Sequence, residues 1–204
     1  IMKNLKCKVV GTNEIRLNNP QSADSLNRYA KAMKEINSIH HSKKTDGDRE
    51  QLENISIESK LYFNEELGVW IPTTWIMAAI GGVSFKELGI GKKVIREGVY
   101  MSNTKAKLYY SGMDKVKKIS DVVLNHDFKA VEFHKVGAAK IPKGTPKFNN
   151  WSFEIDLDFD EETITEQQMI RAVKIMVERK GFGDFRPTYG RGTVEDLVVT
   201  ECEY

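Results

Sequence analysis

The sequence predicts an α+β fold, and three observations in its last quarter carry this prediction. Residues 151–159 alternate apolar and polar side chains, which indicates a strand that is buried on one face. Apolar side chains then recur at helical spacing from residue 169 to residue 177, and Gly181 is expected to end that helix. Residues 192–201 are rich in valine and are typical of a second strand. The predicted order is strand, helix, glycine-rich loop, strand.

The first part of the chain adds elements of both kinds. We expect a strand over residues 3–10 and a helix over residues 23–40, in which apolar side chains fall on one stripe. Residues 40–48 are polar and rich in turn formers, so they are expected to form a loop. The stretch 55–63 alternates and turns into 69–71, which predicts a β-hairpin.

The elements expected between residues 73 and 150 are shorter. Thr73 or Thr74 can cap a helix over residues 75–80, which Gly81-Gly82 is expected to end. Further strands are expected in three places, residues 99–101, 107–110 and 129–136. Residues 137–150 are rich in Lys, Gly and Pro, which predicts an irregular connection.

Composition bounds the function. The 204 residues are 40% hydrophobic and 29% charged, which are ordinary values for a globular protein. No apolar run approaches the roughly 20 residues that a spanning helix needs, so we expect a cytoplasmic protein. The net charge of +2 argues against a surface coated for duplex DNA, and any nucleic-acid site must be local. Cys7 and Cys202 lack metal-ligand spacing and are expected to be free thiols, and neither a metal nor a cofactor is expected.

The loop after the predicted helix has the residue choices of a shaped turn. Two Gly-X-Gly pairs bracket a cationic segment that contains Pro187, and glycine permits the positive φ that such turns need. We expect the loop to present unpaired backbone amides and two arginines to an anion such as a phosphate. The alternative is a structural turn with solvated arginines. The residues concerned are Gly181, Gly183, Arg186, Gly190, Arg191 and Gly192.

This strand, helix and glycine loop resemble the C-terminal unit of the RAMP superfamily, the RNA-recognition-like proteins that bind and process guide RNA in CRISPR systems. The segments 69–80 and 141–148 resemble two further pieces of that superfamily, and together the three cover about half of the chain. The resemblance implies a ferredoxin-like (RRM-like) core in a single domain, 1–204, with helical and hairpin insertions at about 22–52 and 102–150. The acidic residue and the proline in the loop spacer depart from the family pattern.

The segment from Gly183 to Arg191 also resembles small phage and prophage proteins. This second resemblance implies a mobile-element origin, in which case the protein would act in the host cytoplasm.

Clusters of cations are the second group of candidate nucleic-acid contacts, and the alternative is that they are solvated faces. The clusters that flank glycine-rich segments are favoured, namely Lys92, Lys93 and Arg96, and Lys140 and Lys143. Aromatic side chains that could stack bases beside them, unless they belong to the core, are Phe148, Tyr109, Tyr110, Phe185 and Tyr189.

Two further groups of residues bear on catalysis and on metal binding. His40 and His41 follow the first helix, where the resemblance to RAMP endoribonucleases would place a general base; the alternative is two inert surface histidines. The acidic row Glu154, Asp156 and Asp158 has alternate side chains about 7 Å apart, too far for one metal ion. We therefore expect a solvated sheet face there.

The favoured function is a non-enzymatic protein that binds single-stranded nucleic acid, RNA or DNA, and assembles along it, as the resemblance to RAMP backbone subunits implies. Its partners would be the nucleic acid, further copies of this chain, or a CRISPR or phage protein assembly, with no membrane. One alternative is a metal-independent endoribonuclease that uses His40 or His41. The other is a phage inhibitor that mimics a RAMP subunit and binds host proteins.

Overall fold

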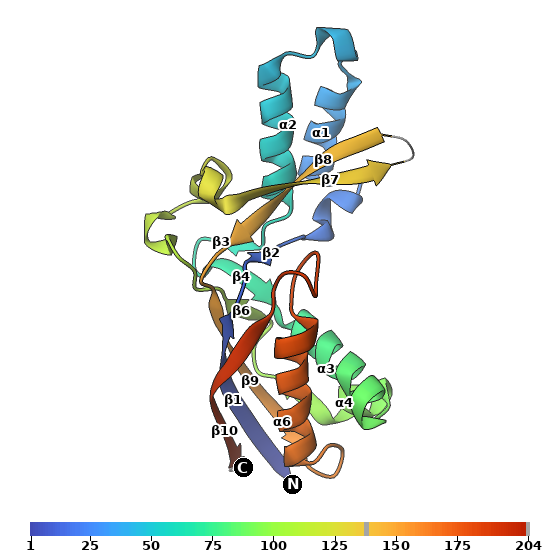
Figure 1. Ribbon diagram of the computed structural model, residues 1–204, viewed down its shortest axis with the longest axis vertical. Helices are drawn as coiled ribbons and strands as arrows, with labels where there is room; N and C mark the ends of the chain where they lie inside the picture. The colour runs from blue at the N-terminus through green and yellow to red at the C-terminus, as the bar shows by residue number, and fades with distance from the viewer. Residues whose placement is uncertain (137–138, 203–204) are drawn as a thin grey trace. The chain divides into compact units, whose positions relative to one another are not determined.

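The computed structural model describes residues 1–136 and 139–202, with the side chains of 134–142 left out (Figure 1). The chain divides into two compact units. Unit 1 holds residues 1–15, 69–111 and those from 149 onward, whereas unit 2 holds residues 16–68 and 112–148. The two segments of unit 2 overlap the ranges 22–52 and 102–150, where insertions were expected.

Unit 1 is built on a four-stranded antiparallel sheet with the strand order β10-β1-β9-β5. Its strands are β1 (Met2–Gly11), β5 (Val99–Met101), β9 (Ser152–Asp160) and β10 (Gly192–Glu201). The first and last of these along the chain are neighbours, and the third lies between the first and the second, which is the ferredoxin-like arrangement. The predicted α+β, ferredoxin-like core is confirmed.

Helices cover one face of this sheet, as Figure 1 shows for α3 and α6. Helix α3 (Thr73–Leu88) and helix α4 (Lys92–Gly98) precede β5, and helix α6 (Glu166–Ile175) continues through the π-helical turn η5 (Met176–Lys180). The core beneath them contains the apolar positions of the alternating strands, which are fully buried: Leu5, Val9, Phe153, Leu157 and Phe159. The strand pattern read from the sequence is confirmed.

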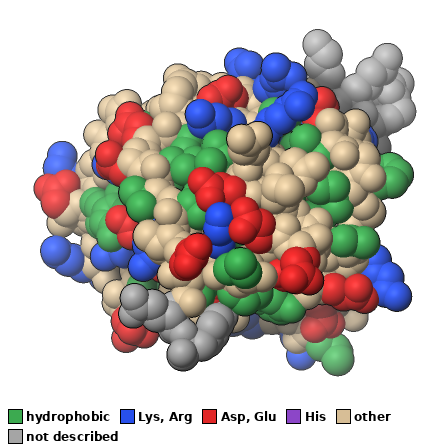
Figure 2. Space-filling view, turned by 90° about the horizontal axis from the view of Figure 1, so that it is seen from below, with side chains coloured by type: hydrophobic (Ala, Val, Ile, Leu, Met, Phe, Trp, Pro, Cys, Tyr) green, Lys and Arg blue, Asp and Glu red, His purple; other side chains and the backbone are tan. Residues whose placement is uncertain are grey.

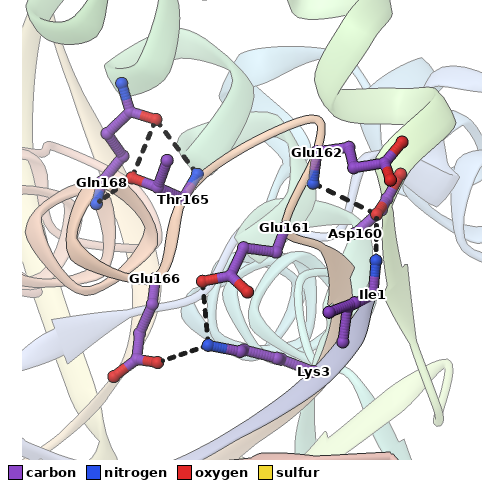
Figure 3. Close-up of polar contacts among 8 residues, drawn as sticks. All are labelled: Ile1, Lys3, Asp160, Glu161, Glu162, Thr165, Glu166 and Gln168. Carbon is purple, nitrogen blue, oxygen red and sulfur yellow. Dashed lines mark hydrogen bonds and ion pairs between the residues drawn. The ribbon is translucent and has the colours of Figure 1, made fainter.

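The start of α6 is fixed by polar contacts (Figure 3). Thr165 and Gln168 form the predicted capping box, in which the Gln168 amide N–H donates to Thr165 Oγ1 at 3.3 Å. Lys3 Nζ on β1 donates to Glu161 Oε1 at 2.8 Å and to Glu166 Oε2 at 2.9 Å, and these hydrogen bonds raise the pKa of Lys3. The first strand is thereby tied to the first turn of α6.

Unit 2 contains helices of 11 and 14 residues, α1 and α2, and a three-stranded sheet of order β2-β8-β7. Its elements include β2 (Ile15–Arg16), α1 (Arg28–Ser38), α2 (Asp46–Ser59), α5 (Ile119–Val123), β7 (Lys129–Val136) and β8 (Ala139–Phe148). Short elements complete the chain: η1 (Pro20–Ala23), η2 (His41–Lys43), β3 (Phe63–Asn64), β4 (Gly68–Pro72), β6 (Lys105–Lys107), η3 (Met113–Lys115) and η4 (His126–Phe128).

Two expectations for residues 23–63 are wrong. The stretch 55–63, predicted as a strand, lies mostly in α2, because Thr45 and Asp48 form a capping box that starts this helix upstream. The first helix begins at Arg28 instead of residue 23, since the side chain of Asn27 accepts the Tyr29 amide and caps it there. Leu26 consequently lies on the surface.

Two further expectations, both based on glycine, are wrong as well. Helix α3 continues through Gly81-Gly82 and ends at Gly89, whose φ of +70° is left-handed. A Cβ on Gly81 would lie 3.9 Å from Lys92 Cγ, so α4 packs close to α3 at that point. The connection expected over residues 137–150 contains strand β8.

None of the helices in the described part of the chain combines the length and the hydrophobicity needed to cross a bilayer.

Candidate nucleic-acid interface

The glycine loop between η5 and β10 is shaped by close backbone approach. Gly181 and Gly190 have positive φ angles of +68° and +77°, and the Phe182 amide donates to the Gly190 carbonyl at 2.9 Å. A Cβ on Gly190 would lie 1.9 Å from the Phe182 carbonyl oxygen, and a Cβ on Gly192 would lie 2.4 Å from that of Val10. The predicted need for glycine at these positions therefore has a direct steric cause.

The expectation of unpaired amides in this loop is wrong for most of it. The Gly190 amide donates to the Glu14 carbonyl at 2.8 Å, and the Arg191 amide donates to Asn13 Oδ1 at 3.1 Å. Loop amides that donate within the protein are those of Gly181, Phe182, Phe185, Thr188, Tyr189, Gly190 and Arg191. The segment after β1 thus holds the loop in place, and side chains are left to contact a ligand.

The side chains of the loop divide into buried and exposed groups. Phe182 is fully buried and meets the Phe153 ring edge-on at a centroid distance of 5.1 Å, which anchors the loop to the core. Phe185 and Tyr189 pack against each other at 6.5 Å. Arg186 and Arg191 are exposed. The loop is therefore anchored by the buried Phe182, and its two arginines remain exposed to solvent.

A groove of about 400 Å³ lies between α3 and this loop, entirely within unit 1. Small side chains of α3 form one wall, namely Ala78, Ala79, Gly82 and Val83. The other lining residues are Lys86 at the end of α3, Arg179, Lys180 and Gly181 at the end of η5, and Arg186 and Pro187 in the loop. Among the residues that the structure describes, four cations and no acidic residue line the groove, so its potential is positive and suits an anionic ligand.

An exposed aromatic ring stands beside this groove. Phe85 precedes Lys86 on α3 and is 57% exposed. Lys92 on α4 places its Nζ 5.9 Å from the centroid of the Phe85 ring. Phe85 and Lys92 therefore add an apolar surface and a fifth cation next to the four that line the groove.

The structure brings together only some of the predicted contacts. Gly181 and Arg186 line the groove, and Lys92 stands beside it, whereas Lys93 pairs with Glu97 at 3.7 Å and Arg96 is exposed on α4. The predicted residues outside the groove lining also include Gly183, Gly190, Arg191 and Gly192. Lys143 lies in unit 2, and the side chain of Lys140 lies outside the described residues.

Sequence reasoning missed Lys86, Arg179 and Lys180. The signal that could have found them is a pair of cations in the last turn before Gly181. Cations at such a position complement the helix dipole, so they are easily taken for ordinary helix ends.

The histidines and the acidic row do not line this groove. His40 and His41 are exposed in unit 2, and the Nδ1 of His40 bonds Ser42 Oγ at 2.8 Å. On the sheet, Asn4 Nδ2 donates to Asp156 Oδ1 at 2.8 Å and to Asp158 Oδ1 at 2.7 Å. Among the described residues, no group of His, Cys, Asp and Glu could hold a metal ion.

Charge elsewhere is mixed. Figure 2 shows a face on which acidic and basic side chains are interspersed with hydrophobic ones, without a broad area of one sign. This agrees with the small net charge of +2, and it makes a groove whose charged lining residues are all cations a local feature.

No protein-family model and no curated protein sequence matches this chain. A solved structure does: "Cryo-EM structure of the Type III-B Cmr-beta bound to cognate target RNA" is similar with a TM-score of 0.57 at 13% sequence identity, over 98% of this chain and 61% of that one. The fold of this chain is therefore similar to that of the matched chain. This chain spans about three fifths of the length of the chain that it matches.

A second structure with a RAMP-type name is less similar. "Crystal structure of Cmr6 from Pyrococcus furiosus" gives a TM-score of 0.30 at 11% identity over 99% of both chains, which is too low to support an argument. The α+β, ferredoxin-like fold that the sequence suggested agrees with the first comparison. The phage origin, DNA as a ligand and self-assembly stay predictions.

Proposed function

We propose that this chain is a non-enzymatic protein that binds single-stranded nucleic acid, RNA in the first place, across the groove between α3 and the glycine loop. The observation that carries the proposal is the meeting of Lys86, Arg179, Lys180 and Arg186 in one groove without an acidic lining residue. Guanidinium and ammonium groups bind phosphate oxygens through charge-assisted hydrogen bonds. The resemblance to RAMP proteins, and the target RNA to which the similar Cmr-beta structure is bound, support this choice of ligand.

The dimensions and the charge favour a single strand. A duplex presents two phosphate rows, and binding it commonly requires a broad basic surface, whereas this protein has a net charge of +2 and one short groove. A longer strand would extend beyond the groove on both sides. We therefore also propose that further subunits bind next to this chain along the strand, as the resemblance to RAMP backbone subunits suggests.

The size of the salt effect follows from the number of cations. Single-strand binding loses about 0.7 powers of ten in affinity per neutralised phosphate for each tenfold rise in salt. The four groove cations thus predict a slope of about −3. Between about 50 and 200 mM salt, the affinity for a labelled RNA should fall by roughly 50-fold.

The test removes two charges from the groove and two from elsewhere. Lys86→Ala with Arg186→Ala should weaken RNA binding and flatten the salt slope by about 1.4. Lys115→Ala with Lys117→Ala, which removes two exposed cations of unit 2, is the matched control and should leave the slope unchanged. Equal slopes for both double variants and the unmodified protein would refute a role of the groove.

A further inference from the structure

Phe85 is not buried, so packing in the hydrophobic core does not explain a phenylalanine at this position. The neighbouring position Ser84 is fully buried and Gly82 and Lys86 line the groove, so Phe85 stands on the side of α3 that faces solvent beside the groove. Exposing 57% of a phenylalanine side chain forgoes hydrophobic stabilisation. An aromatic ring kept at the surface between Lys86 and Lys92 therefore suggests a ligand that is both flat and anionic.

We propose that Phe85 is a stacking platform for one base of the bound strand, an inference that rests on the proposed function. Bases stack on exposed aromatic rings in proteins that bind single strands, and this contact tolerates any base because each has a π-face. Lys92 Nζ lies over one face of the ring, 5.9 Å from its centroid, so the base would stack on the other face and Lys92 would add a positive charge near the neighbouring phosphate. Phe85 would thus hold a base while the groove holds the backbone.

The aromatic residues that the sequence suggested for stacking fit this role less well. Phe148 is fully buried and Tyr110 is 7% exposed, so both belong to the core. Phe185 and Tyr189 are half-buried and pack against each other. Tyr109 is 44% exposed, but the different cavity that it lines contains Glu154 and Asp156 as well as Lys105 and Lys107, so that cavity lacks the purely cationic charge of the groove.

Stacking on Phe85 has a consequence for specificity. A base in a duplex is already stacked on its neighbours and paired, and moving it onto a protein ring costs free energy. Phe85 would therefore favour unpaired strands over duplexes without reading the identity of the base. This adds selection of strand state to a groove that recognises only phosphates.

The test compares Phe85→Leu with Phe85→Trp on a labelled RNA of about 12 nucleotides and on the same backbone with abasic positions. Phe85→Leu should weaken binding of the base-bearing RNA by roughly 5- to 150-fold, whereas Phe85→Trp should bind as well as the unmodified protein. The salt slope should not change, because no charge is removed. Tyr109→Leu removes an exposed ring that also carries a lysine, Lys107 at 5.4 Å, and serves as the control without effect.

The abasic RNA separates stacking from other causes. Phe85→Leu should bind it as the unmodified protein does, and a folding defect would weaken both RNAs alike. Unchanged binding of the base-bearing RNA by Phe85→Leu, or an equal loss for both RNAs, would overturn the stacking while the groove variants still test the proposed function. Absence of any salt-dependent binding by the unmodified protein would overturn both.

Discussion

Replacing Gly190 by alanine should destabilise unit 1 far more than replacing Gly89, although both residues have positive φ. The angles are +77° at Gly190 and +70° at Gly89, so an alanine is strained at either position by about 1–2 kcal/mol. A Cβ on Gly89 would meet nothing within 4 Å, whereas a Cβ on Gly190 would lie 1.9 Å from the Phe182 carbonyl oxygen. Gly89→Ala therefore measures the backbone strain alone.

The additional loss of folding free energy at Gly190 comes from the backbone atoms that must move to relieve the clash. Relieving the clash displaces the Phe182 carbonyl and disturbs two hydrogen bonds, Phe182 N–H to Gly190 O at 2.9 Å and Gly190 N–H to Glu14 O at 2.8 Å. Each such bond contributes about 0.5–1.5 kcal/mol to the free energy of unfolding. Gly190→Ala should thus cost about 2–5 kcal/mol, against about 1–2 kcal/mol for Gly89→Ala.

Tryptophan fluorescence during urea unfolding is the assay, because all three tryptophans, Trp70, Trp75 and Trp151, belong to unit 1. The signal therefore reports the unfolding of that unit without a contribution from unit 2. The midpoint of Gly190→Ala should fall well below that of Gly89→Ala at an unchanged m-value. Equal midpoints would show that the loop opens without cost and would refute the steric account of the glycine loop.

Two further predictions concern the histidines and the cysteines. His40→Ala combined with His41→Ala should leave RNA affinity and RNA integrity unchanged; a metal-independent cleavage product that disappears in this variant would instead support the endoribonuclease alternative. Burial raises the pKa of the Cys7 thiol to about 12, above the ordinary value near 8.5. Above about pH 8.5 this thiol ionises in the unfolded chain but not in the folded protein, so the folded state loses stability as the pH rises further. An alkylating reagent near pH 8 should modify the half-buried Cys202 and reach Cys7 only after unfolding, and equal labelling rates of the native protein would contradict this.

The part of the fold that could be predicted is the part where local signals agree. Residues 151–201 combine an alternating strand, a capping box at Thr165 and a glycine at the end of the helix, and all three hold in the structure. The prediction of a strand over 55–63 failed because the alternation is too short to exclude a helix: in α2, Ile57 is fully buried whereas Ile55 is only half-buried. The capping box at Thr45, ten residues before Ile55, is the local signal that favours a helix over this stretch.

The candidate site could be predicted only in part, because it is assembled by packing. Arg186 was found from the composition of its loop, whereas Lys86 belongs to α3, about a hundred residues earlier in the chain. No local pattern indicates that α3 runs through Gly81-Gly82 and brings Lys86 to the loop. The same reason applies to the amides of Gly190 and Arg191, since their acceptors Glu14 and Asn13 follow the first strand.

The glycine loop and the segment after β1 contact each other but are far apart in the sequence, and this separation sets the order in which the parts of the fold can form during synthesis. Asn13 is synthesised 178 residues before its partner Arg191, and the whole of β10 follows Arg191. Both segments of unit 2 are complete at Phe148, so that unit can fold while the last strand of unit 1 is still being made. The groove can therefore form only after residues 179–187, at the end of η5 and in the glycine loop, have joined α3, when unit 2 is already complete.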